Sequence, residues 1–331
     1  MRRRVIRSEL TFLPRYLSAQ WGRVRAARAD LRAARARIEQ TLGISIELAN
    51  QVQASREELT ALTRRVDELA AQTSAEHHRE LEVLRVVRDE DARSWERLWH
   101  LRRSEEYALA FDEADPLVTI IVTTFNRPEL LRDRALPSVL AQTYEHLECI
   151  VVGDAAPAEI ADVVDSFADE RFRFVNLPYR GPYPARSEDA WLVGGTPPHN
   201  TGLALARGHW IGFVNDDDAL RATYVESLLR LARAERAEVP YGRFVLHEPG
   251  GGSETLGRFP PAWGDWALPG SLLHSALRFM PLQLSDWMFS IPHDVGLLER
   301  MLRLGVRFAM HDEIVFDYYP SLAWRDRPPI R

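Results

Sequence analysis

An apolar run from Trp210 to Val214 ends abruptly at four consecutive polar residues, Asn215, Asp216, Asp217 and Asp218. The run predicts a short buried strand that delivers three carboxylates to its C-terminal end. Like charges this close repel one another, so the cluster is costly unless a cation or solvent compensates it. Carboxylate oxygens are the ligands that Mg²⁺ or Mn²⁺ prefers, and such ions are usually shared with a substrate phosphate. The competing interpretation is a solvated turn that caps the following helix.

The elements that position this cluster alternate between strands and helices from Pro116 onward. Apolar strands are predicted at 117–123, 147–152 and 172–177, and helices at 128–142, 157–168 and 200–207. Continuous apolar strands that alternate with helices predict a mostly parallel, buried sheet. Ligands of such sheets bind at the carboxyl ends of the strands. We therefore expect three polar segments to share one edge of the sheet: Thr124–Arg127, Gly153–Asp154 and Asn215–Asp218.

The bulk composition is that of a globular protein. Of its 331 residues, 46% are hydrophobic and 27% are charged, and the net charge is −6, which argues against a general nucleic-acid partner. Cys149 is the single cysteine and lies in an apolar run, so it forms no internal disulfide and nothing points to an oxidising compartment. No apolar stretch approaches the ~20 residues that span a bilayer. We expect a cytoplasmic protein, or one at the inner face of the membrane.

Residues 1–112 differ from the rest because they are rich in the helix formers Ala, Arg, Glu and Leu. Heptad spacing appears in two short stripes, Leu59, Leu62, Val66 and Leu69, and then Leu81, Leu84 and Val87. The predicted organisation is an α-helical or coiled-coil region at 1–112 and an α/β domain at 113–331. The stripes permit homo-oligomerisation, or packing of an amphipathic helix on the chain's own domain. The arginine-rich segment 2–37 permits peripheral membrane contact, or a solvated helix face.

Four fragments in the α/β region carry a family resemblance. They are Pro116–Arg127, Ser138–Tyr144, Glu148–Asp154 and Asn200–Gly208, and the acidic cluster follows the last of them. Their order and spacing resemble the nucleotide-sugar-binding half of a family 2 glycosyltransferase. The resemblance implies the GT-A fold, a mostly parallel sheet flanked by helices, with a nucleotide-sugar-binding half at 113–220 and an acceptor-binding half at 221–331.

The resemblance also implies roles for individual residues. The nucleotide-sugar site would comprise Thr124, Phe125, Asn126, Arg127, Asp154, His199, Asn200 and Asp216. Asp154 would bond the uracil or ribose, because a carboxylate accepts hydrogen bonds from base N–H and ribose hydroxyl groups. His199 stands where the family has Arg, and Asn200 with Gly202 would shape the turn near the diphosphate. Gly153 replaces a family Asp, which leaves the identity of the base open.

The family's metal motif is Asp, any residue, Asp. Its first position falls on Asn215 and its last on Asp217, so Asp217 is the predicted ligand of Mn²⁺ or Mg²⁺. Asp216 and Asp218 offer a second frame with the same spacing. The metal would neutralise charge on the departing nucleoside diphosphate.

An inverting transfer also needs a base for the acceptor hydroxyl. The resemblance places it at Asp294, with His293 in place of the usual Glu, Arg300 six residues later and Gly305–Phe308 as the following strand. A helix N-cap is the structural alternative for Asp294. Asp286 is the competing candidate base.

The predicted function is a metal-dependent inverting glycosyltransferase. Its donor would be a nucleotide-diphosphate sugar, with a UDP-sugar favoured. Its hydroxyl acceptor would be a glycan or glycolipid, for example in cell-envelope polysaccharide synthesis. The alternative is a catalytically impaired nucleotide-binding scaffold that acts through the helical N-terminal arm, motivated by Asn215, Gly153 and His199. A nucleotidyltransferase is a third candidate, but the segment after the first strand lacks the basic, glycine-rich loop typical of that class.

Overall fold

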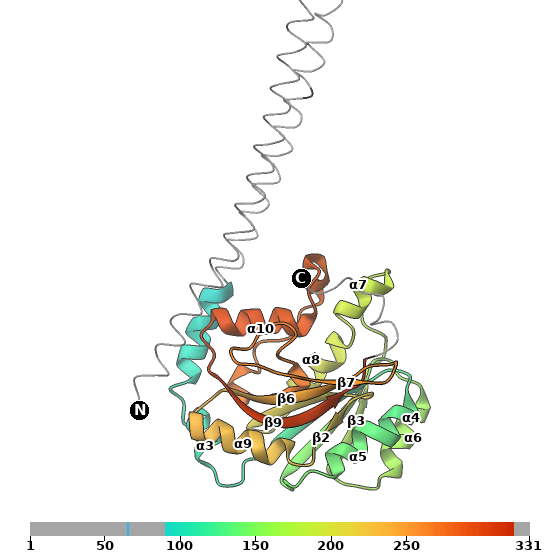
Figure 1. Ribbon diagram of the computed structural model, residues 1–331, viewed down its shortest axis with the longest axis horizontal. Helices are drawn as coiled ribbons and strands as arrows, with labels where there is room; N and C mark the ends of the chain where they lie inside the picture. The colour runs from blue at the N-terminus through green and yellow to red at the C-terminus, as the bar shows by residue number, and fades with distance from the viewer. Residues whose placement is uncertain (1–64, 66–89, 321–331) are drawn as a thin grey trace, which may run out of the picture. The chain divides into compact units, whose positions relative to one another are not determined.

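The computed structural model describes Arg65 and residues 90–320 (Figure 1). The predicted heptad stripes, the basic segment 2–37 and the residues after 320 lie outside the described part of the chain. The chain divides into two compact units, Met1–Arg93 and Ser94–Arg331. The boundary therefore falls earlier than residue 112.

The reason for the earlier boundary is that α3 (Glu105–Asp112) packs into the core of the second unit. Tyr107 and Phe111 are buried there, and the indole Nε1 of Trp210 donates to the carbonyl of Ala110 at 2.8 Å. Ser104 caps the helix, because its hydroxyl accepts from the backbone N–H of Tyr107. A helix whose apolar face is buried in this core belongs to the unit that contains the core.

The main sheet contains the four predicted strands and a fifth, β8, which was not predicted. Its order is β3-β2-β1-β4-β8, with β1 at Val118–Thr124, β2 at Leu147–Gly153, β3 at Phe172–Asn176, β4 at Trp210–Asn215 and β8 at Leu272–His274. The first four strands are parallel and β8 is antiparallel to β4. All residues of β1 and β2 are buried, which explains their continuous apolar, β-branched sequences. The prediction of a mostly parallel, buried sheet is confirmed.

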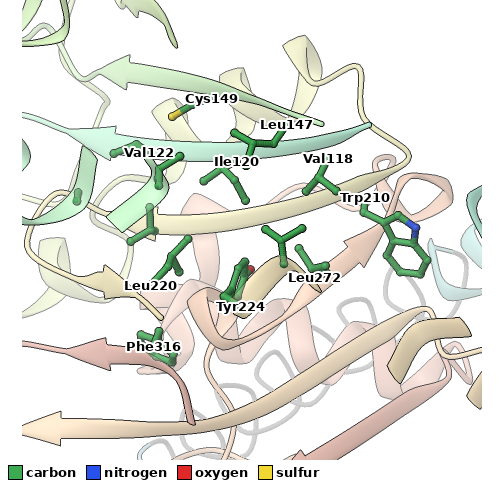
Figure 2. Close-up of a cluster of buried hydrophobic side chains, with 14 of the residues drawn as sticks. Val118, Ile120, Val122, Leu147, Cys149, Trp210, Leu220, Tyr224, Leu272 and Phe316 are labelled. Carbon is green, nitrogen blue, oxygen red and sulfur yellow. The ribbon is translucent and has the colours of Figure 1, made fainter. Parts of the chain in front are cut away.

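Helices cover both faces of this sheet (Figure 1). Side chains alternate between the faces along a strand. Val118, Ile120 and Val122 of β1 belong to one buried cluster, which includes residues of α6 (Ala158–Ser166) and α9 (Tyr224–Glu235) and is drawn in Figure 2. Ile121 belongs to a second cluster with residues of α8 (Thr196–Leu205) and α10 (His293–Arg303). The sheet is thus a central layer between two helical layers.

The predicted helix 128–142 is divided into three parts. They are α4 (Pro128–Leu130), a π-helical turn at Leu131–Ala135 and α5 (Leu136–Leu140). Pro137 lies in the first turn of α5 and has no N–H to donate to the preceding turn. The local change of hydrogen-bond register accommodates that missing donor.

A smaller sheet brings the C-terminal strand to the acidic cluster. Its order is β5-β9-β6-β7, with β5 at Ala219–Leu220, β9 at Phe308–Tyr318, β6 at Val239–His247 and β7 at Ser253–Leu256. β5 directly follows Asp218 and pairs with the end of β9. The remaining described elements are a helical stretch at 90–101, α7 (Ser187–Leu192) and three 3₁₀ turns, Leu268–Gly270, Ser275–Leu277 and Leu284–Phe289. None of the described helices combines the length and apolar content that crossing a bilayer would require.

Candidate active site

The three polar segments that follow β1, β2 and β4 lie side by side, as predicted. Thr124 pairs with Gly153 across β1 and β2, and Thr123 pairs with Asn215 across β1 and β4. Beyond the strand ends, the N–H of Asp154 donates to Thr124 O at 2.9 Å, and the N–H of Asp216 donates to Thr123 O at 3.2 Å. Their common edge is the carboxyl end of the parallel sheet, where ligands of α/β proteins bind.

Two carboxylates of the acidic loop face Arg127. Asp216 is buried and accepts from the Thr124 hydroxyl at 2.8 Å, whereas the side chain of Asp217 is 15% exposed. Arg127 Nη1 donates to Asp217 Oδ2 at 2.5 Å, and Nη2 forms an ion pair with Asp216 Oδ1. Burial raises the pKa of Asp216 to about 6, with Arg127 acting in the opposite direction. Asp217 is therefore the carboxylate of this pair that is more accessible to a ligand.

The other two residues of the cluster are turned into the protein. Asp218 is fully buried, and its oxygens accept from the Asn215 amide at 3.0 Å and from the Tyr319 backbone N–H at 2.9 Å. Burial, reinforced by the nearby Asp217 charge, raises the pKa of Asp218 to about 8. In this arrangement Asp218 anchors the chain after β9 and is not available to a metal ion. Of the residues predicted as metal ligands, Asn215 and Asp218 bond each other and Asp217 is the more exposed.

A divalent cation at this edge would need a substrate phosphate to complete its coordination. Among the residues that the structure describes, no group of three or more His, Cys, Asp or Glu side chains is arranged to hold a metal ion. Asp217 offers the more exposed carboxylate, and the buried Asp216 Oδ1 lies beside it, paired with the Arg127 guanidinium. Mg²⁺ and Mn²⁺ are commonly held by one or two carboxylates together with substrate phosphates. The donor set fits that mode of binding.

Asp154 is covered by the segment between β3 and α7. Its Oδ1 accepts from the Gly181 N–H at 3.0 Å, and its Oδ2 accepts from the Tyr183 hydroxyl at 2.7 Å. The guanidinium of Arg180 lies 4.1 Å from the centre of the Phe125 ring. Arg180 and Tyr183 were not predicted as site residues. Their contacts with Phe125 and Asp154 depend on where their loop lies in the fold, and no sequence motif marks them. A nucleotide that bonds Asp154 has to replace these contacts.

Gly153 is explained by its neighbour Asn176. A Cβ atom at position 153 would lie 2.6 Å from Asn176 Oδ1 and 2.8 Å from the Cβ of Ala156. The Asn176 amide accepts from the backbone N–H of Ala156 and donates to its carbonyl, both at 2.8 Å. The space that a family Asp would need at position 153 is therefore taken by Asn176, which sequence reasoning missed.

His199 and Asn200 have partners inside the protein. Nδ1 of His199 lies 2.7 Å from Gly195 O, and burial lowers the pKa of the imidazole to about 4. The ring is neutral at pH 7 and cannot supply a positive charge to a phosphate. Asn200 donates to Leu282 O and accepts from Leu282 N, each at 2.9 Å. These contacts give Asn200 a clamping role, and the predicted phosphate contacts of both residues stay untested.

Asp294 lies in the first turn of α10. Its Oδ1 accepts from the Val295 N–H at 2.9 Å, and burial raises the pKa of the carboxyl despite that bond. The preceding His293 contacts α8, because its Nδ1 lies 2.6 Å from Thr196 Oγ1. Burial lowers the pKa of His293 to about 3, so the ring is neutral at pH 7. Asp294 thus has the raised proton affinity expected of a general base.

Asp286 is the more enclosed of the two candidate bases. It is 5% exposed, and a Cβ atom on Gly296 would lie 2.3 Å from its Oδ2. Oδ2 has no hydrogen-bond partner among the described residues. Burial raises the pKa of Asp286 to about 6, Arg300 opposes the shift, and Glu299 and Asp294 add to it. Asp286 therefore packs against α10 and is less accessible to an acceptor hydroxyl than a general base needs to be.

We expect Asp286→Asn to stabilise the protein above pH 6 and to change stability little near pH 4. A carboxyl whose pKa is raised on folding binds protons more tightly in the folded state, so stability falls as pH rises from about 4 to about 6. Removing the charge should increase the free energy of unfolding at pH 8 by about 1–3 kcal/mol. Urea unfolding at the two pH values measures the difference, with Asp312→Asn, whose side chain is 92% exposed, as the control. Equal effects at both pH values would contradict the raised pKa.

Comparison with known proteins identifies the family. The profile described as "Glycosyl transferase family 2" matches residues 119–190 and 193–296, more than half of the chain, and these ranges include every site residue named above from Thr124 to Asp294. The chain therefore belongs to glycosyl transferase family 2. Together with the observed sheet order, this membership identifies the α/β unit as a GT-A fold.

Individual relatives match only part of the chain. Identity is 30% over 138 residues with the GalNAc(5)-diNAcBac-PP-undecaprenol beta-1,3-glucosyltransferase of Campylobacter jejuni, 41% of this chain and 40% of that one. It is 22% over 132 residues with the UDP-Glc:alpha-D-GlcNAc-diphosphoundecaprenol beta-1,3-glucosyltransferase WfaP of Escherichia coli, 40% and 47% of the chains. The crystal structure of S. aureus TarS 1–349 in complex with UDP superposes with a TM-score of 0.49 at 15% identity, covering 62% and 60%. These curated relatives are matched over less than half of their own length.

Proposed function

We propose that this chain transfers a sugar from a nucleotide-diphosphate donor to a hydroxyl acceptor with inversion at the anomeric carbon. The observation that carries the proposal is a series of contacts between the two sides of the site. Tyr183 bonds Asp154 at 2.7 Å and accepts from the Gly195 N–H at 3.2 Å. The next residue, Thr196, contacts His293 at 2.6 Å, and His293 precedes Asp294. The candidate nucleotide-binding carboxylate and the candidate base thus belong to one connected site.

The donor side would be formed by the segments after β1, β2 and β4. Thr124, Phe125, Asn126 and Arg127 would line the nucleotide pocket, with Asp154 bonding the base or ribose. A UDP-sugar is favoured, because the E. coli relative is named for UDP-Glc. A divalent cation held by Asp217 would neutralise the charge that develops on the leaving diphosphate.

The acceptor side would use Asp294. As the acceptor oxygen forms a bond to the anomeric carbon, the bond from that carbon to the diphosphate oxygen breaks, and its electron pair leaves with the nucleoside diphosphate. Asp294 takes the proton of the acceptor hydroxyl, so charge balances in one displacement. Burial raises the pKa of Asp294, which makes the carboxylate a stronger base than an exposed aspartate.

A glycolipid acceptor is supported by an apolar surface near the candidate bases. Met288 and Phe289 follow Asp286 in the same 3₁₀ turn and are 65% and 61% exposed. Both undecaprenol-directed relatives are named for lipid-linked acceptors. An exposed apolar pair suits contact with a lipid-linked glycan at a membrane surface, which also fits peripheral attachment of the protein.

The scaffold alternative is less well supported by the geometry. Its motivation was that Asn215, Gly153 and His199 depart from the family pattern. Asn176 fills the space that an Asp side chain would need at position 153, which explains Gly153. Asn215 bonds Asp218, but the Asp217 side chain remains partly exposed. We propose that the helical region before the catalytic unit is a tether or oligomerisation arm and takes no part in the chemistry.

We expect one nucleoside diphosphate to bind the full chain in a metal-dependent manner. Calorimetric titration with UDP, GDP, dTDP and CDP, each with and without Mn²⁺, identifies the donor class. UDP should bind tightest, and a UDP-sugar should then yield UDP when an undecaprenyl-diphosphate-linked glycan is added. Absence of binding by any nucleotide to the folded protein would reject the transferase, and nucleotide binding without sugar transfer would favour the scaffold.

A further inference from the structure

Arg127 bridges two carboxylates of the acidic loop, those of Asp216 and Asp217. It follows β1 and reaches across to the loop after β4, where Nη1 donates to Asp217 Oδ2 at 2.5 Å and Nη2 pairs with Asp216 Oδ1. The Arg127 side chain is 40% exposed, whereas those of Asp216 and Asp217 are 1% and 15% exposed. The guanidinium therefore closes the solvent side of the carboxylate pair.

The second arginine at this loop makes a different kind of contact. Arg134 donates to the backbone carbonyl of Asp217, and its guanidinium lies 3.8 Å from the centre of the Tyr319 ring. It supports the loop without occupying a carboxylate oxygen. Arg134 is thus a matched cation nearby that leaves the metal-facing atoms free.

A metal ion and the Arg127 guanidinium compete for the Asp217 carboxylate. A divalent cation bound by Asp217 requires a carboxylate oxygen at close range, and Oδ2 already accepts from Arg127. Two cations on neighbouring oxygens also repel each other. Arg127 and the metal therefore weaken each other's binding at Asp217.

We propose that Arg127 is a resident counter-ion that holds Asp216 and Asp217 together until the donor and its metal arrive. On their arrival the metal takes Asp217, and the released guanidinium turns to the donor diphosphate, which an arginine fork binds well. This inference rests on the proposed metal site at Asp217. It makes Arg127 a positioning residue whose displacement couples metal binding to nucleotide binding.

Coupling of this kind is reciprocal. If the diphosphate draws Arg127 away from Asp217, it raises the affinity for metal, and the metal raises the affinity for nucleotide by the same factor. Part of that coupling should vanish when position 127 has no charge. The coupling that remains in such a variant would come from direct contact between the metal and the phosphate.

The test is a titration of the full chain with Mn²⁺ in the absence of nucleotide. Binding is measured as the decrease of the free Mn²⁺ signal in electron paramagnetic resonance. We expect Arg127→Gln to bind Mn²⁺ about tenfold or more tightly than the wild type, and Arg134→Gln to differ from it by less than about threefold. Arg127→Lys keeps the charge without the planar fork and should fall between them. Repeating the titrations with UDP should show a smaller gain in Mn²⁺ affinity for Arg127→Gln than for the wild type. Thermal melting checks that each variant is folded.

Two results would overturn the inference. The first is an Mn²⁺ affinity in Arg127→Gln that is unchanged or weaker than that of the wild type. The second is an increase in Mn²⁺ affinity in Arg134→Gln as large as that in Arg127→Gln, which would reflect the loss of any nearby positive charge. The proposed metal site is decided separately in the same series, by Mn²⁺ binding to the wild type with UDP and by its loss in Asp217→Ala. Metal-independent sugar transfer would count against the proposed function, while the nucleotide-free titration would still decide the competition.

Discussion

Asp294→Asn is expected to lower kcat by roughly 10²- to 10⁴-fold while leaving nucleotide affinity nearly unchanged. The amide keeps the shape of the carboxyl and still accepts from the Val295 N–H, so the first turn of α10 stays intact. It cannot take a proton from the acceptor hydroxyl. Steady-state kinetics with a lipid-linked acceptor measures kcat, and calorimetry with UDP measures the donor affinity.

The companion variant Asp286→Asn decides between the two candidate bases. Asp286 lies against Gly296 and is 5% exposed, so its replacement should lower kcat by less than about tenfold. Wild-type kcat should also fall as pH is lowered through the raised pKa of Asp294, because the protonated acid is not a base. A large loss in Asp286→Asn together with normal turnover in Asp294→Asn would exchange the two roles.

The sheet and its functional edge could be predicted because their signals are local. β1, β2 and β4 are runs of consecutive apolar residues, and the polar residues after them mark the strand ends in the sequence itself. Parallel pairing then places all the carboxyl ends together. The division of residues 128–142 into three helical parts was missed, although Pro137 carried a local signal for it.

The contacts of the site side chains could not be predicted because they join distant segments. Asn200 bonds Leu282, Asp218 bonds Tyr319 and Asp154 bonds Tyr183, and in each case the partner is fixed by tertiary packing. The motif favoured Asp217 as the metal ligand but left the frame of Asp216 and Asp218 open. Burial and the partners of Asp218 separate them.

The unit boundary illustrates the same limit. The helix-forming composition of residues 1–112 hides the point at which the chain begins to pack on the sheet. Tyr107 and Phe111 read as part of the helical region, yet both are buried with residues of β4 and β8. Only the folded structure shows that α3 belongs with the catalytic unit.

Asp217→Ala should abolish the Mn²⁺-dependent part of UDP binding and lower kcat/KM by roughly 10²-fold or more, because the variant loses the accessible carboxylate of the acidic loop. Its fold should be retained, since Asp217 is partly exposed and Asp218 still holds Asn215 and Tyr319. The measurements are UDP titration with and without Mn²⁺, and initial rates at several Mn²⁺ concentrations.

The control for this loss is Asp218→Asn, which replaces a neighbouring carboxyl that faces the interior. Burial and the nearby Asp217 charge raise the pKa of Asp218 to about 8, so much of this carboxyl is already protonated at pH 7 and an amide should be tolerated. Metal-dependent UDP binding should therefore persist in Asp218→Asn and be lost in Asp217→Ala. The opposite pattern would place the metal on the frame of Asp216 and Asp218, which requires the loop to turn Asp218 outward and to release Tyr319. A loss in neither variant would remove the acidic loop from donor binding and leave Arg127 and Asp154 to hold the nucleotide.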